Sequence, residues 1–277
     1  MNSSVAIRII WIFAAFLSID ANVDPIEGRY SFSLTTFHPS GKLPQLSHAI
    51  KASTLGPPII AVRNQHGISL ASLQSLPSPL IRDDGTSRFV SITNSIIVGH
   101  TGVNADGRVV TEAAQRLAVE HAYTFQEEIP MNILLEELAL LFQEYTMKAG
   151  VRPFGCCLIV AGVNDGLFQI DPAGTVTKLD RDEKGIGFAG KGDASVILER
   201  IQEKLEDLNG ESKSLTDLDN LLVETLQEQV AGGERIGSSS QSIICASLSS
   251  KRKESLRGHR IRRVPVGTKK ESMMDEE

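Results

Sequence analysis

The order of periodic segments constrains the fold of this chain more than any other feature of its sequence. Short apolar or alternating segments, typical of strands, come in pairs, such as 59–63 and 68–73, which flank a turn at 64–67. Two helical patterns follow the first strands, and two more follow the later ones. Because short hairpin turns join the strands, we expect mainly antiparallel sheets. The sequence therefore predicts an α+β fold: a four-layer α-β-β-α sandwich, with two antiparallel sheets flanked by helix pairs.

The other elements are predicted from the same patterns and from glycine and proline boundaries. The predicted strands are 89–92, 95–99, 156–161, 167–170, 175–178 and 242–248. The predicted helices are 45–52, 106–124, one that begins near Pro130, 194–209 and 214–230. Arg152-Pro153-Phe154-Gly155 converts a helix that ends near Gly150 into the buried strand at Cys156. The glycine-rich residues 185–192 carry no strand prediction.

Composition and charge divide the chain into three parts. The 277 residues are 41% hydrophobic, and the formal net charge of −6 argues against a nucleic-acid partner for the main body. Residues 251–277 hold nine Lys or Arg and five Asp or Glu. We therefore predict an N-terminal extension over 1–28, one domain over 29–250 and a charged, disordered tail over 251–277. Basic runs in the tail suit a nuclear address and a solvated tail equally well.

The N-terminal extension and the cysteines point to different compartments. Arg8 precedes an apolar run at 9–17, and small residues follow it, a pattern that resembles a secretory signal peptide. The run is too short to span a bilayer, which needs about 20 apolar residues, so no membrane partner is expected. The alternative is a non-functional extension. Three cysteines, two of them adjacent, indicate buried thiols of a reducing compartment.

No pattern in the sequence predicts an active site, a cofactor or a metal. The chain has no Gly-x-Ser-x-Gly elbow, and its phosphate-loop fragments lack the required glycine spacing. The histidines lie in predicted turns, helices and the tail, without metal-ligand spacing, and are expected to be surface or satisfied residues; they are His38, His48, His66, His100, His121 and His259. Some four-layer sandwiches are amidases whose nucleophile is an N-terminal Thr, Ser or Cys at the start of the first strand. Here a long segment precedes that strand.

An ordered set of motifs connects the chain to a known family. The motifs are Tyr-Ser-Phe-Ser-Leu-Thr-Thr-Phe at 30–37, Pro-Ser-Gly-Lys-Leu at 39–43, Asp-Gly-Arg-Val at 106–109, Gln-Glu-Tyr-Thr at 143–146, Gly-Val-Arg-Pro-Phe-Gly at 150–155 and Asp-Pro-Ala-Gly at 171–174. By these motifs, residues 29 to about 248 resemble α-type subunits of the proteasome core particle, the type-2 group above all. The resemblance implies the N-terminal-nucleophile hydrolase fold without the nucleophile, hence a non-catalytic subunit of a threonine-type endopeptidase complex.

The resemblance also implies partners and sites. α-Type and β-type subunits build a particle of stacked heptameric rings that acts in ubiquitin-dependent protein degradation in cytoplasm and nucleus. The α tails gate the pore, and grooves between α subunits receive the C-terminal tails of activators. By analogy the gate residues here are Tyr30, Ser31, Pro39 and His48, where Ser31 and His48 replace the family's Asp and Tyr. Gln74 stands at a position assigned to a pocket Lys, so weakened activator docking is expected.

These departures keep two alternatives open. One is an orphan or secreted paralogue that no longer assembles, which the signal-like extension and the altered first helix favour. The other is a stand-alone amidase of the same fold, which the missing N-terminal nucleophile disfavours.

Overall fold

The computed structural model describes residues 36–75, 87–148, 150–181, 184–207, 214–232, 241–249 and 259–265, which form two antiparallel sheets. One sheet has, in spatial order, β11 (His259–Pro265), β10 (Gln241–Ser249), β2 (Gly67–Ser75), β1 (Ile59–Asn64), β9 (Lys184–Ala189) and β8 (Asp180–Arg181). The other has β3 (Phe89–Ser91), β4 (Ile96–Gly102), β5 (Cys156–Gly162), β6 (Gly166–Ile170) and β7 (Val176–Lys178).

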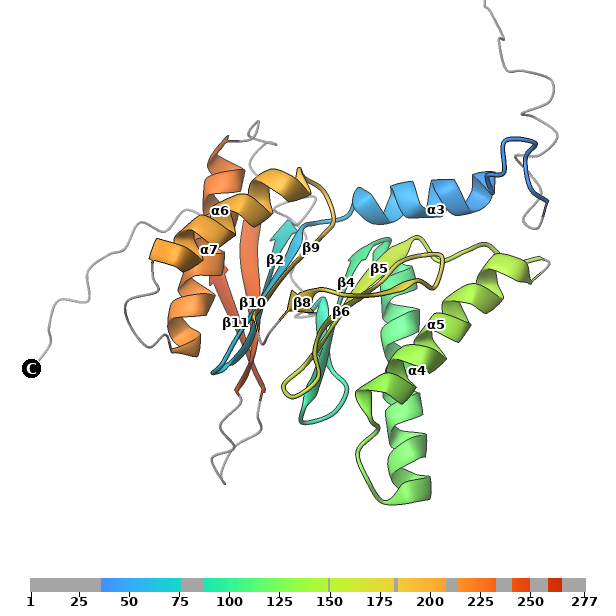
Figure 1. Cartoon of the computed structure of the whole chain (residues 1–277), viewed down its shortest axis with the longest axis horizontal. Helices are drawn as coiled ribbons and strands as arrows, with labels where there is room; N and C mark the ends of the chain where they lie inside the picture. The colour runs from blue at the N-terminus through green and yellow to red at the C-terminus, as the bar shows by residue number, and fades with distance from the viewer. Residues whose placement is uncertain are drawn as a thin grey trace, which may run out of the picture.

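Helices cover the outer faces of both sheets and complete four layers (Figure 1). α6 (Ala194–Asp207) and α7 (Leu215–Gly232) lie on the six-stranded sheet, and α4 (Asn104–Phe125) and α5 (Met131–Met147) lie on the five-stranded sheet. α3 (Pro44–Thr54) crosses one end of the five-stranded sheet and contacts β4 and β5. The predicted α-β-β-α sandwich is confirmed.

The core consists of three apolar clusters, one in each space between layers. β5 shows how the alternation of a strand fills two of them, because all of its residues are buried. Leu158 and Val160 pack against α4 and α5, whereas Ile159 and Ala161 face the other sheet. A strand between two layers buries both of its faces, which explains the continuous apolar run in its sequence.

Two parts of the sheets differ from the prediction. β9 forms next to β1 in the region where glycine hides any strand periodicity, and the short β8 pairs with β9. β11 forms inside the segment predicted to be a disordered tail, where it pairs with β10 from Ser242↔Pro265 to Leu248↔His259. Its ladder with β10 stabilises a basic strand at the sheet edge, and charged side chains are common on such edges. The disorder prediction is therefore wrong for 259–265.

The cysteines and helices of the described segments bear on the predicted compartment. Cys156, Cys157 and Cys245 are buried free thiols. Burial raises the pKa of Cys157 and of Cys245 to about 12 each, so these thiols stay protonated and unreactive at neutral pH. None of the helices within the described ranges combines the length and apolar character required to cross a bilayer.

Candidate functional site

α3, the end of β4, the start of α4 and residues 150–155 meet at one end of the sandwich, where their backbones touch. Gly102 has a φ of +97°, and a Cβ there would lie 2.3 Å from the carbonyl oxygen of Gly155. A Cβ on Gly56, just after α3, would lie 2.0 Å from the backbone nitrogen of Gly102. The N–H of Val103 donates to Gly155 O at 2.9 Å. Glycine at these positions lets these backbone segments approach each other directly.

The Arg-Pro-Phe-Gly segment fixes this junction through Asp106 in the first turn of α4. Arg152 donates to both oxygens of the Asp106 carboxylate, Nη1 to Oδ2 at 2.6 Å and Nη2 to Oδ1 at 2.7 Å. The N–H of Gly155 donates to the same Oδ2 at 2.9 Å. Phe154 packs on Phe142 with ring centroids 5.4 Å apart. The segment thus joins α4, α5 and β5, a structural role.

The Asp106 carboxyl is ionised because its partners outweigh its burial. Its side chain is 9% exposed, against 65% for Arg152. Burial acts to raise the pKa of the carboxyl, but the hydrogen bonds from Arg152 and the Gly155 N–H lower the pKa by more.

The predicted gate residues fall partly outside the described residues, because Tyr30 and Ser31 precede 36. Pro39 lies exposed in a turn before α3, where Gly41 N donates to the carbonyl oxygen of His38 at 2.7 Å. His48 lies exposed in the second turn of α3. Pro39 and His48 therefore share one exposed segment.

Gln74, the predicted pocket residue, points into the protein. It lies on β2 opposite Ser242 of β10, on the strand face of Ile68 and Leu70, which pack between the sheets. Gln74 is half-buried, and its Oε1 is buried without a hydrogen-bond partner. The side chain therefore faces the space between the sheets at the end of β2.

Arg88 and His100 are the residues that sequence reasoning missed. Arg88, just before β3, is half-buried, and its Nη1 has no hydrogen-bond partner. His100 was expected at the surface or satisfied, but it lies in β4, 1% exposed, with Nδ1 buried and unpartnered. Burial lowers the pKa of each of these side chains. The sequence signal that could have found them is their position: Arg88 directly precedes one predicted strand, and His100 directly follows the next. The two strands pair antiparallel.

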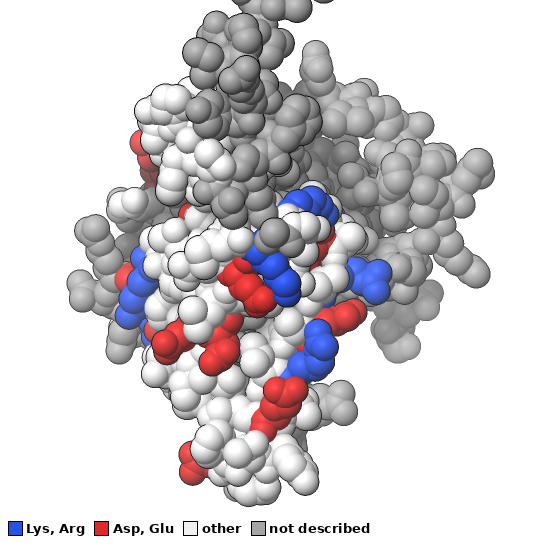
Figure 2. Space-filling view, turned by 90° about the vertical axis from the view of Figure 1, so that its right-hand side faces the viewer, with Lys and Arg blue, Asp and Glu red and all other residues white. Residues whose placement is uncertain are grey.

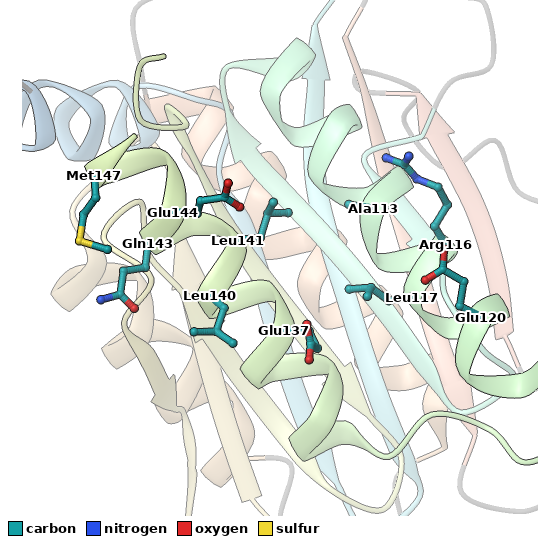
Figure 3. Close-up of a pocket in the computed structure, with 10 residues that line it drawn as sticks. All are labelled: Ala113, Arg116, Leu117, Glu120, Glu137, Leu140, Leu141, Gln143, Glu144 and Met147. Atoms are coloured by element: carbon teal, nitrogen blue, oxygen red, sulfur yellow. The ribbon is translucent and has the colours of Figure 1, made fainter. Parts of the chain in front are cut away.

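A groove runs between α4 and α5 on the outer face, with a volume of about 560 Å³. Figure 3 shows side chains of the two helices along it, with Arg116 and Glu120 on α4 and Glu137 and Glu144 on α5. Leu140 and Met147 add apolar surface, 52% and 61% exposed. On this side of the molecule acidic and basic side chains are interspersed among uncharged ones (Figure 2). Among the described residues, no three His, Cys, Asp or Glu side chains group as a metal site would require.

Known proteins resemble the chain over the part that runs from β1 to α7. The family described as "Proteasome subunit" matches residues 54–236. The chain is 38% identical over 152 residues to "Proteasome subunit alpha type-2" of Oryza sativa subsp. indica, covering 54% of this chain and 65% of that protein. It is 39% identical over 149 residues to "Proteasome subunit alpha type-2" of Drosophila melanogaster, covering 53% and 64%. The match thus spans less than two thirds of these relatives' length.

Proposed function

The chain belongs to the proteasome subunit family, and we propose that it is a non-catalytic α-type subunit of the proteasome core particle, acting in ubiquitin-dependent protein degradation. Its partners would be other α-type and β-type subunits in stacked heptameric rings. Similarity to α type-2 subunits of rice and Drosophila supports this assignment.

The start of β1 carries the proposal that the subunit is non-catalytic. An N-terminal nucleophile requires the first strand to begin at a free α-amino group. Here α3 precedes β1, and the intervening backbone is bound in place. Thr101 Oγ1 donates to the carbonyl oxygen of Pro57 at 2.6 Å, and the N–H of Lys191 donates to that of Gly56 at 2.7 Å. The position of the nucleophile is thus occupied by a continuous, hydrogen-bonded chain.

Exposed apolar side chains on α3 and just after its end supply a test of ring assembly. Ile50 and Leu55 are 40% and 65% exposed, and the resemblance places this helix against a neighbouring subunit. We expect the tagged full chain to migrate with the core particle on native gels. Ile50→Asp should reduce its share in the particle at least about tenfold, because a carboxylate buried in an interface costs well over about 1.4 kcal/mol.

Val176→Asp is the matched control, since Val176 lies on β7 with 38% exposure. It should leave incorporation unchanged. A chain that migrates alone, at the size of a monomer, would favour the orphan paralogue instead. If Ile50→Asp were incorporated fully, α3 would not be part of the subunit interface.

We further propose a cytoplasmic and nuclear location. The buried free thiols support a reducing compartment. The secretory alternative depends on residues 1–21, which lie outside the described residues.

The gate proposal rests on the resemblance and on the segment before α3. Tyr30, Ser31, Pro39 and His48 would take the gate positions, with His48 offering an imidazole where the family has a phenol. The turn at Pro39 is held by local hydrogen bonds, including Ser40 N to His38 Nδ1 at 3.2 Å.

For activator docking we propose that Arg88 supplies the cation that receives an activator's C-terminal carboxylate. Arg88 is half-buried and carries a buried Nη1 without a hydrogen-bond partner, which supports this proposal, whereas Gln74, the position expected from sequence, is neutral and faces the inter-sheet space. Arg88→Gln should weaken binding of an activator-tail peptide roughly tenfold. The reason is the loss of about half of a charge-assisted hydrogen bond of about 1.5–3 kcal/mol.

Fluorescence anisotropy of a labelled tail peptide with assembled particles measures this loss, and added salt should shrink it. Gln74→Lys is the companion variant. If Gln74→Lys raised the peptide affinity while Arg88→Gln left it unchanged, the carboxylate would bind at position 74, and the Arg88 assignment would be contradicted.

A further inference from the structure

His100 and Arg88 are direct neighbours across two strands. The N–H of His100 donates to the carbonyl oxygen of Arg88 at 3.2 Å, one step beyond the Phe89↔Gly99 pair. Residues that face each other in this way have Cβ atoms about 4.5–5.5 Å apart. Phe89 packs between the sheets, so Arg88 and His100 both lie on the opposite face, under α4.

The imidazole of His100 is held between β4 and the first turn of α4. Its Nε2 lies 3.0 Å from Oδ1 of Asn104, so Nε2 carries the hydrogen. A Cβ on Gly107 would come within 2.1 Å of Cδ2 of the ring, which shows how closely the helix backbone covers it. Nδ1 is buried and has no hydrogen-bond partner, and Nη1 of Arg88 has none either. Two buried nitrogens are thus left unpaired, one on β4 and one just before β3.

The charges around His100 favour its neutral form. Burial lowers the pKa of His100 most, the hydrogen bond to Asn104 raises it by less than burial lowers it, and the positive charge of Arg88 lowers it a little further. α4 contributes Asp106, whose carboxylate is bound by Arg152, and β5 contributes the buried thiol of Cys156 on the same face. At neutral pH Nδ1 therefore carries a lone pair and cannot donate to an anion.

We propose that His100 takes up a proton from solvent when a carboxylate binds at Arg88, so that carboxylate docking tightens as the pH falls. This inference rests on the docking role of Arg88 proposed above. The carboxylate neutralises the guanidinium charge that opposes protonation, and protonated Nδ1 becomes a donor on the same face. The ligand class is a carboxylate, whether the C-terminus of a peptide or a free small acid.

The direction of the pH dependence follows from linkage. A bound anion close to His100 raises the pKa of the imidazole, because a nearby negative charge favours the protonated form. Between the free and the bound pKa, binding one carboxylate takes up one proton, and affinity rises up to about tenfold for each unit of falling pH. Above the bound pKa the proton is absent and the gain disappears.

The test measures the titration of His100 itself, in the purified full chain. The Cε1–H resonance of His100 is followed by NMR from about pH 5 to about pH 8, in acetate and in chloride of equal ionic strength. Acetate should raise the midpoint by about one unit, and Arg88→Gln should abolish the shift. His121, half-buried on α4, is the internal control, and its resonance should not respond to acetate.

Three results would overturn the inference: no shift of the His100 midpoint in acetate, an equal shift at His121, or a shift that persists in Arg88→Gln. This readout is independent of ring assembly. A chain that shows the acetate shift but fails to enter the particle would leave the His100 coupling standing and refute the proposed ring role. In assembled particles, tail-peptide affinity should rise with acidification in the wild type and lose that rise in His100→Gln. The acetate and peptide arms thereby distinguish a small acid from a peptide C-terminus.

Discussion

Asp180→Ala should lower the free energy of unfolding by about 3–5 kcal/mol, because it leaves the charge of Arg63 buried and unpaired. Arg63 on β1 and Asp180 on β8 form an ion pair with side chains 13% and 2% exposed. Asp180 also accepts a hydrogen bond from Leu167 N of the other sheet at 3.4 Å. The pair therefore ties strand β1 to the sheet edge and reaches across to β6. Urea unfolding followed by circular dichroism measures the loss.

The double variant Arg63→Met with Asp180→Asn should recover most of that loss, because neither charge then remains buried. Lys148→Ala is the matched control, since its ion pair with Glu144 has both side chains 57% exposed. It should cost less than about 1 kcal/mol. If Asp180→Ala lowered the free energy of unfolding as little as Lys148→Ala does, the guanidinium of Arg63 would be solvated in the variant rather than left buried.

The second large effect is expected at the junction of α4 with residues 150–155. Asp106→Ala removes a bidentate ion pair with Arg152 and leaves the Gly155 N–H without its acceptor. The exposed guanidinium of Arg152 regains water, so the loss is set by the charge-assisted bonds and the orphaned N–H. We expect about 2–4 kcal/mol, measured by the same urea unfolding.

This contribution depends on pH in a defined direction. The hydrogen bonds from Arg152 and Gly155 hold the pKa of Asp106 below its ordinary value despite burial, which acts to raise it. A depressed folded pKa stabilises the protein above the unfolded pKa of about 3.9, and the stabilisation is lost as the pH falls through the folded value. The difference between wild type and Asp106→Ala should therefore shrink below about pH 4.

Glu112→Ala supplies the control for this site, because Arg108 and Glu112 form an exposed pair on the same helix at 4.0 Å. It should change stability by less than about 0.5 kcal/mol at any pH. A wild-type advantage over Asp106→Ala that persists unchanged in acid would mean that packing, rather than the carboxylate, carries the effect.

Local patterns in the sequence predicted most elements of the fold. The apolar run of β5, the stripe of Leu134, Leu138 and Phe142 on α5, and the hairpin of β1 and β2 are each readable within a few residues. These patterns can be read from the sequence because the burial of one or both faces of an element requires apolar side chains at regular spacing. β9 and β11 were not predicted because their glycine and arginine residues do not alternate between apolar and polar. Long-range pairing with β1 and β10 stabilises these strands instead.

The candidate site was less predictable than the fold. Pro39 and His48 could be placed on a turn and a helix, but the orientation of Gln74 toward the inter-sheet space could not. Likewise the sequence placed Arg88 and His100 at the ends of two predicted strands, but it did not show that their side chains would leave nitrogens unpaired. Which face of a strand a side chain takes depends on register, and register is set by partners elsewhere in the chain.

The sequence by itself determined the order of most elements, the four layers and the helix-to-strand role of Arg-Pro-Phe-Gly, because each follows from local periodicity or from backbone restrictions of proline and glycine. The tertiary structure alone decided the sheet order and the partners of buried charges. Arg152 meets Asp106 from 46 residues away, and Arg63 meets Asp180 from 117 residues away. A buried charge requires a partner, but a local pattern cannot say which distant residue supplies it.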